Sequence, residues 1–359
     1  MNEFSQGEDS SLVLLEKGSA MWRITLNRPG VINSLSPDMV QRLIHILESA
    51  RTDPGCGFLL LDGAGDRGFC AGGDIRYMAD QVRQDHKEEA LRFLSREYRL
   101  DALVHDFPKP VVVLAGGVTM GGGLGISAGA DIVVATESTR MAMPESRIGF
   151  FPDVGATGWL HRKCPPGFPE FLGLTGYELR GRECARVGLA THCLPASGLD
   201  ELISGLGSME IGRTDPDGEA VKEHIRSRVE ALALDPGEDR DMDTWVRDYF
   251  ADLERLGDLS RSLRECSTAT DLCSHVFREF RERSPTALAL TLKLLRRNKG
   301  RDMREVFRTD LRAAEFMLSH PDFLEGVRAR VIDKDQQPRW RHSSFDEADL
   351  TGLDLEEAS

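Results

Sequence analysis

The sequence lacks an excess of basic residues, a paired-cysteine motif and any long apolar run. Its 45 Lys and Arg residues are outnumbered by 59 Asp and Glu residues, so the formal net charge is −14. An acidic chain repels polyanions and does not present the basic face that is typical of nucleic-acid-binding proteins. We therefore expect no nucleic acid as a partner, although a local basic patch is still compatible with a small anionic ligand.

The seven cysteines are odd in number, irregularly spaced and without a C-x-x-C pair. This pattern predicts no disulfide framework and favours a reducing, cytoplasmic location. Residues 1–11 have neither the basic start nor the apolar stretch of a secretory signal, and they are acidic where a transit peptide is rich in arginine. No apolar run approaches the roughly 18 residues that indicate a membrane span, so we expect no membrane association.

Apolar periodicity indicates an α/β protein. Two short apolar runs, 11–17 and 20–26, predict a hairpin, and the Ser36-Pro37 pair predicts the start of an amphipathic helix that ends near Arg51. Continuous apolar runs further along the chain predict strands buried on both faces, and helical patterns alternate with them. These runs are residues 58–62, 110–115 and 131–136.

The 359 residues are enough for one large domain or two modest ones. The pattern weakens and charge rises over 205–243, which predicts a partly exposed connection, and a helical pattern follows it. Residues 343–359 hold six acids and no Lys or Arg, which predicts a solvated end. The predicted domains are therefore a core over 11–205, a C-terminal helical region over 206–342 and an acidic tail over 343–359.

Three local patterns match those of known functional sites but lack the neighbouring elements or ligands that such sites require. Residues 63–68 match G-x-G-x-x-G, yet the segment after them does not form the helix that a dinucleotide site needs. Residues 125–129 match G-x-S-x-G, yet Ser127 falls inside a predicted helix about ten residues after the strand. The His161 and His192 neighbourhoods offer too few ligands for a zinc site, so no metal is expected.

Two glycine-rich segments, 69–75 and 120–125, each follow a buried strand and precede a helix. Glycine at such places lets backbone N–H groups approach a ligand closely. Two such groups that converge on one oxygen would form an oxyanion hole, assisted by the positive end of the second helix. The alternative is that both segments are merely tight turns.

Two acids, Glu145 and Asp153, lie eight residues apart in a stretch constrained by Pro and Gly. Paired carboxylates of this kind suit general acid/base catalysis. The alternatives are a surface salt bridge for Glu145 and a helix N-cap for Asp153.

The chain resembles the crotonase superfamily, also called the enoyl-CoA hydratase/isomerase superfamily, from about Leu12 to Trp340. Within this superfamily the motifs are most similar to those of the 3-hydroxyisobutyryl-CoA hydrolases. The C-terminal block of motifs is specific to that group. The matching residues are 26–29, 69–76, 119–123, 142–145, 149–155, 174–176, 284–286, 322–329, 332–335, Pro338 and Trp340.

The resemblance implies a spiral of ββα units followed by packing helices, and an acyl-CoA thioester as substrate. It implies that the oxyanion hole is formed by the backbone N–H groups of Gly73 and Gly122. It further implies Glu145 as the catalytic acid and Asp153 as the second, hydrolase-type acid. CoA arrives as part of the substrate, so no separate cofactor is expected, and relatives often form homo-oligomers such as trimers.

Three further residues are expected to bind substrate. Glu97 matches a substrate-contact position of the family, Gly72 precedes the oxyanion residue, and Arg76 stands where relatives often place a base near the CoA phosphates. The reaction implied is hydrolysis of a short β-hydroxyacyl-CoA, with 3-hydroxyisobutyryl-CoA and a role in valine catabolism as the best match.

One departure separates hydrolysis from hydration. Hydratases of the family have a second Glu two residues after the glycine triplet, and this chain has Gly125 there. Hydrolysis is therefore favoured, while another crotonase-type reaction such as enoyl-CoA isomerisation, or non-catalytic acyl-CoA binding, stays open. Asp101 replaces an Asn that is frequent in relatives, and residues 156–159, which end in Trp159, replace a Gly-rich, Tyr-containing run of the relatives. These departures leave the identity of the acyl group more open than the reaction class.

Overall fold

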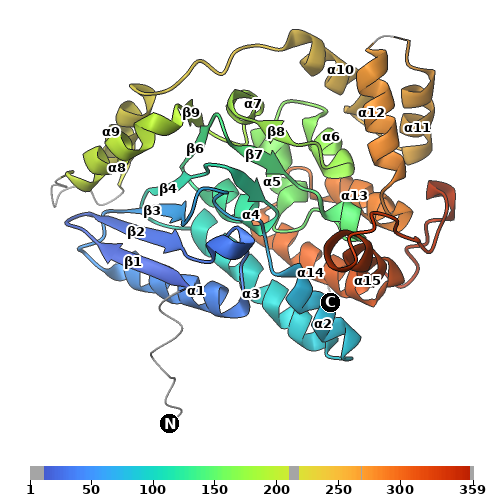
Figure 1. Ribbon diagram of the computed structural model, residues 1–359, viewed down its shortest axis with the longest axis horizontal. Coiled ribbons are helices and arrows are strands. Elements are labelled where there is room, and N and C mark those ends of the chain that lie inside the picture. The colour runs from blue at the N-terminus through green and yellow to red at the C-terminus, as the bar shows by residue number, and fades with distance from the viewer. Residues whose placement is uncertain (1–11, 210–217, 268, 356–359) are drawn as a thin grey trace. The chain divides into compact units, whose positions relative to one another are not determined.

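The computed structural model (Figure 1) describes residues 12–209, 218–267 and 269–355. Its chain divides into two units. Each unit combines separate stretches of the sequence. The first comprises Met1–Gly73, Arg96–Met141 and Leu179–Glu238, and the second comprises Asp74–Ser95, Ala142–Glu178 and Asp239–Ser359. The predicted domains are continuous along the chain, so their bounds stay a prediction.

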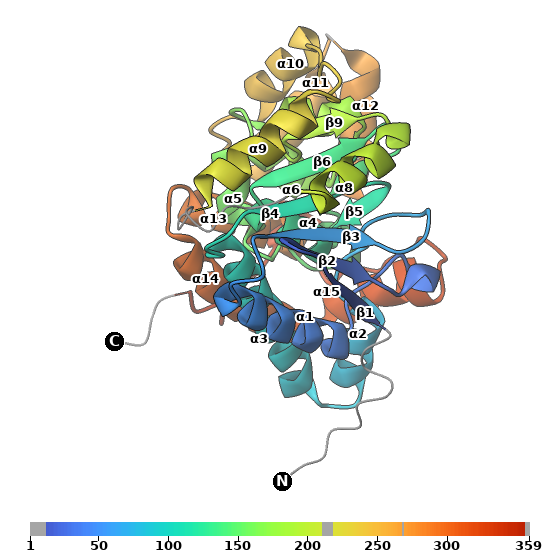
Figure 2. The same cartoon turned by 90° about the vertical axis from the view of Figure 1, so that its left-hand side faces the viewer.

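The first unit contains a six-stranded sheet of order β1-β2-β3-β4-β6-β9 (Figure 2). The predicted hairpin is confirmed, because β1 and β2 pair antiparallel, whereas each later pair is parallel. Parallel strands are buried on both faces, which explains their continuous apolar runs. The strands are β1 (Val13–Lys17), β2 (Met21–Leu26), β3 (Phe58–Gly63), β4 (Val111–Leu114), β6 (Ile132–Thr136) and β9 (His192–Leu194).

A smaller sheet of order β5-β7-β8 and several helices complete the first unit. Its strands are β5 (Val118–Met120), β7 (Arg140–Ala142), which ends one residue into the second unit, and β8 (Leu179–Arg180). The helices are α1 (Pro37–Thr52), the second half of α3 (Lys87–His105), α4 (Gly122–Gly129), α7 (Arg182–Val187), α8 (Leu199–Gly207) and α9 (Glu219–Glu230), with short turns η2 (Pro29–Val31) and η4 (Ala196–Gly198).

Helix α1 begins where the sequence predicts. The Ser36 side chain accepts a hydrogen bond from Met39 N, and Pro37 occupies the first helical position. The expected stripe is buried to 1% exposure or less at every position. These residues are Val40, Leu43, Ile44 and Leu47.

Helix α9 lies in the segment 205–243, which the sequence predicts as a partly exposed connection, and it packs on the core. Its residues Val221, Ile225 and Val229 are buried in one core cluster with apolar residues of the sheet strands and of α8. These three positions are four residues apart, so they form a narrow apolar stripe on an otherwise charged helix. The charge of the segment concealed this stripe from the sequence reading.

The second unit is helical. Its elements are α2 (Ile75–Arg83), the first half of α3, η3 (Glu145–Ile148), α5 (Ala156–Lys163), α6 (Phe168–Thr175), α10 (Arg240–Phe250), α11 (Leu256–Glu265), α12 (Thr270–Arg281), α13 (Pro285–Asn298), α14 (Met303–Ser319), α15 (Pro321–Val327), η5 (Arg328–Ile332) and η6 (Phe345–Glu347). Phe171 of α6 packs against the rings of Trp245 and Phe250 of α10. Aromatic packing therefore joins two helices that are 65 or more residues apart in sequence.

Two features of the C-terminal part go beyond what the sequence indicated. Cys266 and Cys273 form a disulfide between α11 and α12, so an odd, irregular cysteine count did not exclude a single local pair. The acidic tail is not simply solvated, because Leu355 is buried and its carbonyl accepts a hydrogen bond from Arg297 Nη2 at 2.8 Å. The Phe345 ring also contacts Phe280. Apolar residues between the acids hold the tail against the helices.

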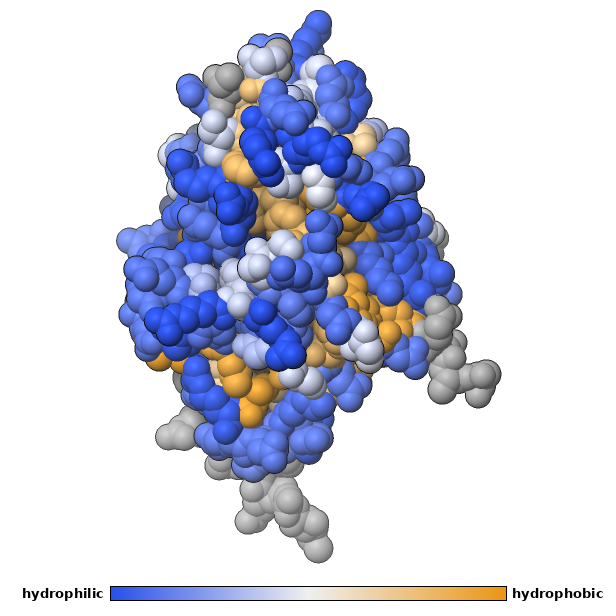
Figure 3. Space-filling view, turned by 90° about the vertical axis from the view of Figure 1, so that its right-hand side faces the viewer, coloured by the Kyte–Doolittle hydropathy of each residue, from blue (hydrophilic) through white to orange (hydrophobic). Residues whose placement is uncertain are grey.

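One face of the protein is drawn in space-filling form in Figure 3. Figure 3 shows one face with polar residues over most of its area and apolar residues in separate patches. Among the described large apolar residues, Leu14, Val31 and Ile332 are the exposed ones. No helix in the described part of the chain is long and apolar enough to cross a membrane.

Candidate active site

The two glycine-rich segments lie side by side in the first unit. Cys70 N donates to the Val118 carbonyl at 3.2 Å, and Met120 N donates to the Cys70 carbonyl at 2.9 Å. Gly72 has a φ of +100°, and a Cβ atom at this position would lie 3.4 Å from Gly122 N. The positive φ therefore favours glycine at position 72, and the second segment leaves little room there for a side chain.

Gly122 begins helix α4, so its N–H has no acceptor within the helix and lies at the positive end of the helix dipole. Glu97 of α3 places its carboxylate against this residue, and a Cβ atom on Gly122 would overlap Glu97 Oε1. The Glu97 side chain is buried, with 2% exposure. The structure thus brings Gly72, Gly122 and Glu97 together, with Gly73 directly after Gly72.

Two nearby groups are not arranged as nucleophiles. Burial raises the pKa of the Cys70 thiol to about 12, so it stays protonated near neutral pH. Ser127 lies inside α4, as predicted, and its hydroxyl donates to the Gly123 carbonyl at 2.7 Å. Neither side chain offers the exposed, activated atom that nucleophilic catalysis needs.

Glu145 belongs to the second unit and begins the short turn η3. Its side chain is 7% exposed, which excludes the surface salt bridge considered for it. Gly149 closes the turn with a φ of +68°, and a Cβ atom there would overlap the Asp322 carbonyl. Gly326 lies equally close to the Ile148 backbone. The C-terminal motif residues of α15 therefore pack directly on the segment that holds Glu145.

Ser284 strengthens this packing. Its hydroxyl donates to buried Asp322 Oδ2 at 2.5 Å and accepts from Ala287 N at 3.1 Å, while its own N–H donates to the Ser146 carbonyl. One serine thus caps helix α13 and joins it to both α15 and η3.

Ser284→Ala is expected to lower the free energy of unfolding by about 2–4 kcal/mol, because the cap and a hydrogen bond to a buried carboxylate are both lost. The matched control is Ser36→Ala, which removes the same Ser-Pro cap from α1 and should cost about 1 kcal/mol. Urea denaturation of both variants measures the difference. Equal losses would contradict a special role for the bond to Asp322.

Asp153 lies in the turn before α5 and is 6% exposed. The N-cap of α5 is Gly155, and no side chain caps the helix, so the N-cap alternative for Asp153 is excluded. Val154 has a left-handed φ of +49°. The Trp159 indole N–H donates to the Val154 carbonyl at 3.0 Å, which gives this buried tryptophan a role in holding the Asp153 turn.

Arg76 lies in the first turn of α2 and is exposed. Its Nη2 donates to the Val331 carbonyl at 2.9 Å. A guanidinium has five N–H donors in a fixed plane, so this bond orients the group and leaves other donors to face an anion.

Asp310 of α14 is a residue that the sequence reading missed. It is fully buried, its Oδ2 accepts a hydrogen bond from Gly155 N at 2.8 Å, and burial together with the charge of Asp153 raises its pKa well above the ordinary value. Nothing in the local sequence marks one acid among 59 as buried.

Asp310→Asn is expected to stabilise the protein more at pH 8 than at pH 5. In the folded state the Asp310 carboxyl keeps a proton that it loses at about pH 3.9 in the unfolded chain. The free energy of unfolding of the wild type therefore falls as pH rises between the unfolded and folded pKa values, by up to about 1.4 kcal/mol per pH unit. Asparagine has no such proton. Urea denaturation at both pH values tests this, and an equal effect at the two would contradict it.

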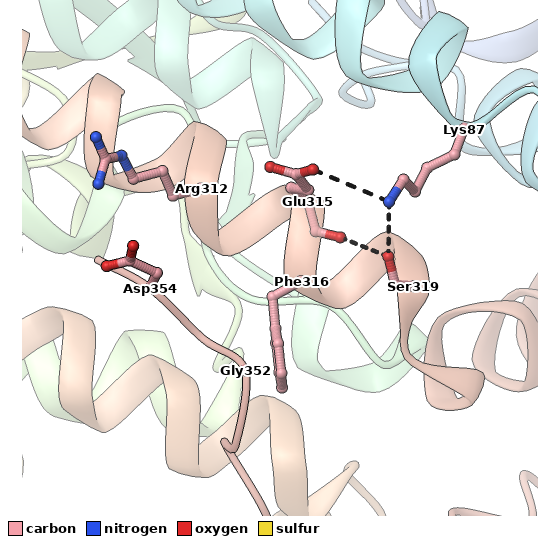
Figure 4. Close-up of a pocket in the computed structure, with 7 residues that line it drawn as sticks. All are labelled: Lys87, Arg312, Glu315, Phe316, Ser319, Gly352 and Asp354. Carbon is pink, nitrogen blue, oxygen red and sulfur yellow. Dashed lines mark hydrogen bonds and ion pairs between the residues drawn. The ribbon is translucent and has the colours of Figure 1, made fainter. Parts of the chain in front are cut away.

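A pocket of about 490 Å³ lies elsewhere in the second unit (Figure 4). None of the predicted site residues lines it. Lys87 Nζ lies 4.0 Å from Glu315 Oε1 and 3.1 Å from Ser319 Oγ, so this cation is already engaged. Two cations and two acids cancel in charge, so the pocket is not the basic patch expected for CoA phosphates. Its lining residues are Lys87, Arg312, Glu315, Phe316, Ser319, Gly352 and Asp354.

The histidines considered as metal ligands have other partners. His161 Nε2 lies 3.1 Å from the Leu295 carbonyl, and His192 Nδ1 lies 2.9 Å from Thr191 Oγ1. Within the described ranges, no group of three or more His, Cys, Asp or Glu residues is placed to hold a metal ion.

The chain is similar to known proteins along nearly its whole length. A family model described as enoyl-CoA hydratase/isomerase matches residues 21–354. The chain is 34% identical to the 3-hydroxyisobutyryl-CoA hydrolase, mitochondrial, of Gallus gallus, over 93% of this chain and 86% of that protein. It is 33% identical to the protein of the same name from Homo sapiens, over 93% and 85% of the two chains.

Solved structures agree on the fold. A structure titled carnitinyl-CoA dehydratase, from Mycobacterium thermoresistibile, superposes with a TM-score of 0.84 at 31% identity and 95% coverage of both chains. A structure titled enoyl-CoA hydratase, from Rhodobacter sphaeroides, gives a TM-score of 0.81 at 31% identity, also with 95% coverage of both chains. The α/β architecture and the resemblance are thereby confirmed, and the chain belongs to the enoyl-CoA hydratase/isomerase (crotonase) family.

Proposed function

We propose that the protein hydrolyses a short β-hydroxyacyl-CoA thioester to the free acid and CoA, with 3-hydroxyisobutyryl-CoA as the first substrate to test. Relatives with that hydrolase name match nearly the whole chain at about one third identity. The observation that carries the choice of reaction is the pair of buried acids Glu145 and Asp153, combined with glycine at position 125. The valine-catabolic role follows from that substrate.

In this proposal the first unit holds the acyl carbonyl. The thioester oxygen accepts hydrogen bonds from Gly73 N–H and Gly122 N–H, and the dipole of α4 stabilises the negative charge that develops on it. Gly72 keeps the approach to this oxygen open. Glu97, which lies against Gly122, is assigned to the hydroxyl group of the acyl chain.

Glu145 and Asp153 supply the acids. By one route Glu145 removes a proton from water, the water oxygen bonds to the thioester carbon, and the C–S bond breaks as the tetrahedral intermediate collapses. By the other, the Glu145 carboxylate attacks the carbon directly, CoA leaves as thiolate, and water then hydrolyses the mixed anhydride. In both routes Asp153 orients the water or substrate hydroxyl, or returns the proton to the CoA sulfur.

Arg76 is assigned to the CoA phosphates, where its fixed guanidinium suits a planar, multi-oxygen anion. Transfer of an acyl group to water needs an oxyanion site and acid/base groups, so the proposal includes no cofactor besides the CoA of the substrate. We also propose a cytoplasmic location and a homo-oligomer such as a trimer. Cell fractionation and light scattering, respectively, test these two points.

The decisive assay follows release of free CoA from 3-hydroxyisobutyryl-CoA with a thiol reagent. We expect turnover with that substrate and little with isobutyryl-CoA, which lacks the hydroxyl assigned to Glu97. Turnover in H₂¹⁸O under single-turnover conditions tests for the anhydride route, because water that attacks the Glu145 carbonyl carbon of the anhydride leaves ¹⁸O in Glu145, whereas direct attack of water on the thioester places ¹⁸O in the product acid alone. Absence of CoA release, with turnover of a 3-enoyl-CoA, would establish the isomerase alternative.

Hydration is the second candidate, because two solved structures at 31% identity have dehydratase and hydratase titles. It requires acid/base groups on both sides of a double bond, and Gly125 offers no side chain for the second of them. Crotonyl-CoA absorbance at the enoyl band tests this candidate directly. If the rate of hydration exceeds that of hydrolysis, the hydrolase proposal fails. If neither reaction occurs but CoA binds, a non-catalytic binder is indicated.

A further inference from the structure

The turn that holds Asp153 is clamped in an unfavourable conformation. Val154 has a φ of +49°, a region that β-branched residues rarely occupy. Gly155 follows with a φ of +78°. Such conformations persist only where the surroundings over-determine them, and they cluster at functional sites. The groups that enforce this turn therefore bear on the position of the Asp153 carboxylate.

Helix α14 supplies one side of the clamp. A Cβ atom on Gly155 would lie 2.6 Å from Met303 Cε and 2.9 Å from Phe307 Cε1, so these side chains fill the space beneath the turn. One turn after Phe307, Asp310 Oδ2 accepts the Gly155 N–H at 2.8 Å. Trp159, which follows the turn in sequence, donates its indole N–H to the Val154 carbonyl. Both polar ends of the Val154–Gly155 peptide group, one residue after Asp153, are thus bound by buried partners.

We propose that Asp310 is a positioning residue for Asp153, which holds the Val154-Gly155 turn in its left-handed conformation so that the Asp153 carboxylate faces the reacting groups. This inference rests on the proposed function, because it assigns Asp310 an effect on catalysis only through Asp153. A misplacement of about 1 Å can cost roughly 10²-fold in rate.

The choice of an acid at position 310 has a second consequence. Asp153 is the charged group whose field acts on Asp310, and two neighbouring carboxylates disfavour double ionisation. Asp310 is also fully buried, whereas Asp153 retains some exposure. Asp310 is therefore the partner that keeps its proton, and it supports the turn without adding a negative charge next to the catalytic acid.

The test is a double-mutant cycle on kcat for thioester hydrolysis. Asp310→Ala alone is expected to lower kcat by about 10- to 100-fold with KM changed by less than about 3-fold. In an Asp153→Asn background the same substitution is expected to change kcat by less than about 2-fold, because the group that it positions is already absent. An equal loss in both backgrounds would overturn the proposal in favour of a general structural role.

Two further variants make the result specific. Asp310→Asn keeps an oxygen that can accept the Gly155 N–H, so it should retain kcat within about 3-fold of the wild type. Thr309→Ala, on the same helix, is the matched control, because its hydroxyl donates to the Glu305 carbonyl in its own helix. If Asp310→Asn loses as much activity as Asp310→Ala, the acceptor argument is wrong.

If Asp310→Ala does not fold, Trp159→Phe takes its place in the cycle, because it removes the hydrogen bond to the Val154 carbonyl. It should lower kcat in the wild type and have little effect on kcat in the Asp153→Asn background. The outcomes also separate the two proposals. If Asp153→Asn keeps full activity, the role of Asp153 in the proposed function fails. If Asp153→Asn lowers kcat but the cycle is additive, only the inference about Asp310 fails.

Discussion

Replacing Glu145 with Gln is expected to lower kcat for 3-hydroxyisobutyryl-CoA hydrolysis by about 10³-fold. General acid/base groups contribute roughly 10²–10⁴ in rate, and a nucleophilic role would make the loss larger. The amide is nearly the same size as the carboxylate, so the η3 turn and its packing against α15 should persist. CoA binding, measured by calorimetry with free CoA, should therefore stay within about 3-fold of the wild type.

The chain offers a matched control for this substitution. Glu170 in α6 belongs to the same unit and is equally buried, at 7% exposure. Burial raises the pKa of this carboxyl group, but the mechanism gives it no role. Glu170→Gln should therefore keep kcat within about 2-fold. A comparable fall in both variants would indicate that loss of any buried acid disturbs the unit, and Glu145 would lose its assignment.

Gly122→Ala is expected to lower kcat/KM by about 10²-fold, in the range found when one oxyanion-hole donor is lost. The alanine keeps its backbone N–H, but its Cβ would overlap Glu97 Oε1. Because the Glu97 side chain is buried, the overlap must move either this carboxylate or the start of α4. Either movement disturbs the geometry around the acyl carbonyl.

Gly207→Ala tests whether any new methyl group on a helix has the same effect. Gly207 ends α8, is exposed, and a Cβ there would make only an ordinary 3.5 Å contact with Met21 Cε. Its kcat/KM should match the wild type. If Gly122→Ala also retains full kcat/KM with the hydroxyacyl substrate, the assignment of Gly122 to the oxyanion hole is contradicted.

The regular elements were largely predictable from the sequence, because their signals are local. The continuous apolar runs correspond to β3, β4 and β6, and the Ser-Pro start with its apolar stripe corresponds to α1. The glycine-rich segments were also recognisable, since glycine is the residue that close backbone approach demands. What the sequence could not supply was which acids near these segments are buried.

The missed features depend on contacts between residues that are far apart in sequence. Asp310 matters through a hydrogen bond to Gly155, which lies 155 positions earlier, and no local pattern distinguishes it from a surface acid. The burial of Glu145 excludes a surface salt bridge, and the N-cap of α5 at Gly155 excludes that role for Asp153. Neither fact can be derived from the local sequence. The number of cysteines in the whole chain does not indicate whether two of them form a local disulfide, so the Cys266–Cys273 pair was not predicted.

The packed tail has a practical consequence for truncation and labelling. A chain shortened at Trp340, where the sequence motifs end, would remove Phe345 and Leu355 and expose the helix surfaces that they cover. Arg297 would also lose the carbonyl that its guanidinium binds. Shortened versions for crystallisation should therefore keep Leu355, and affinity tags or fluorophores are better attached beyond it.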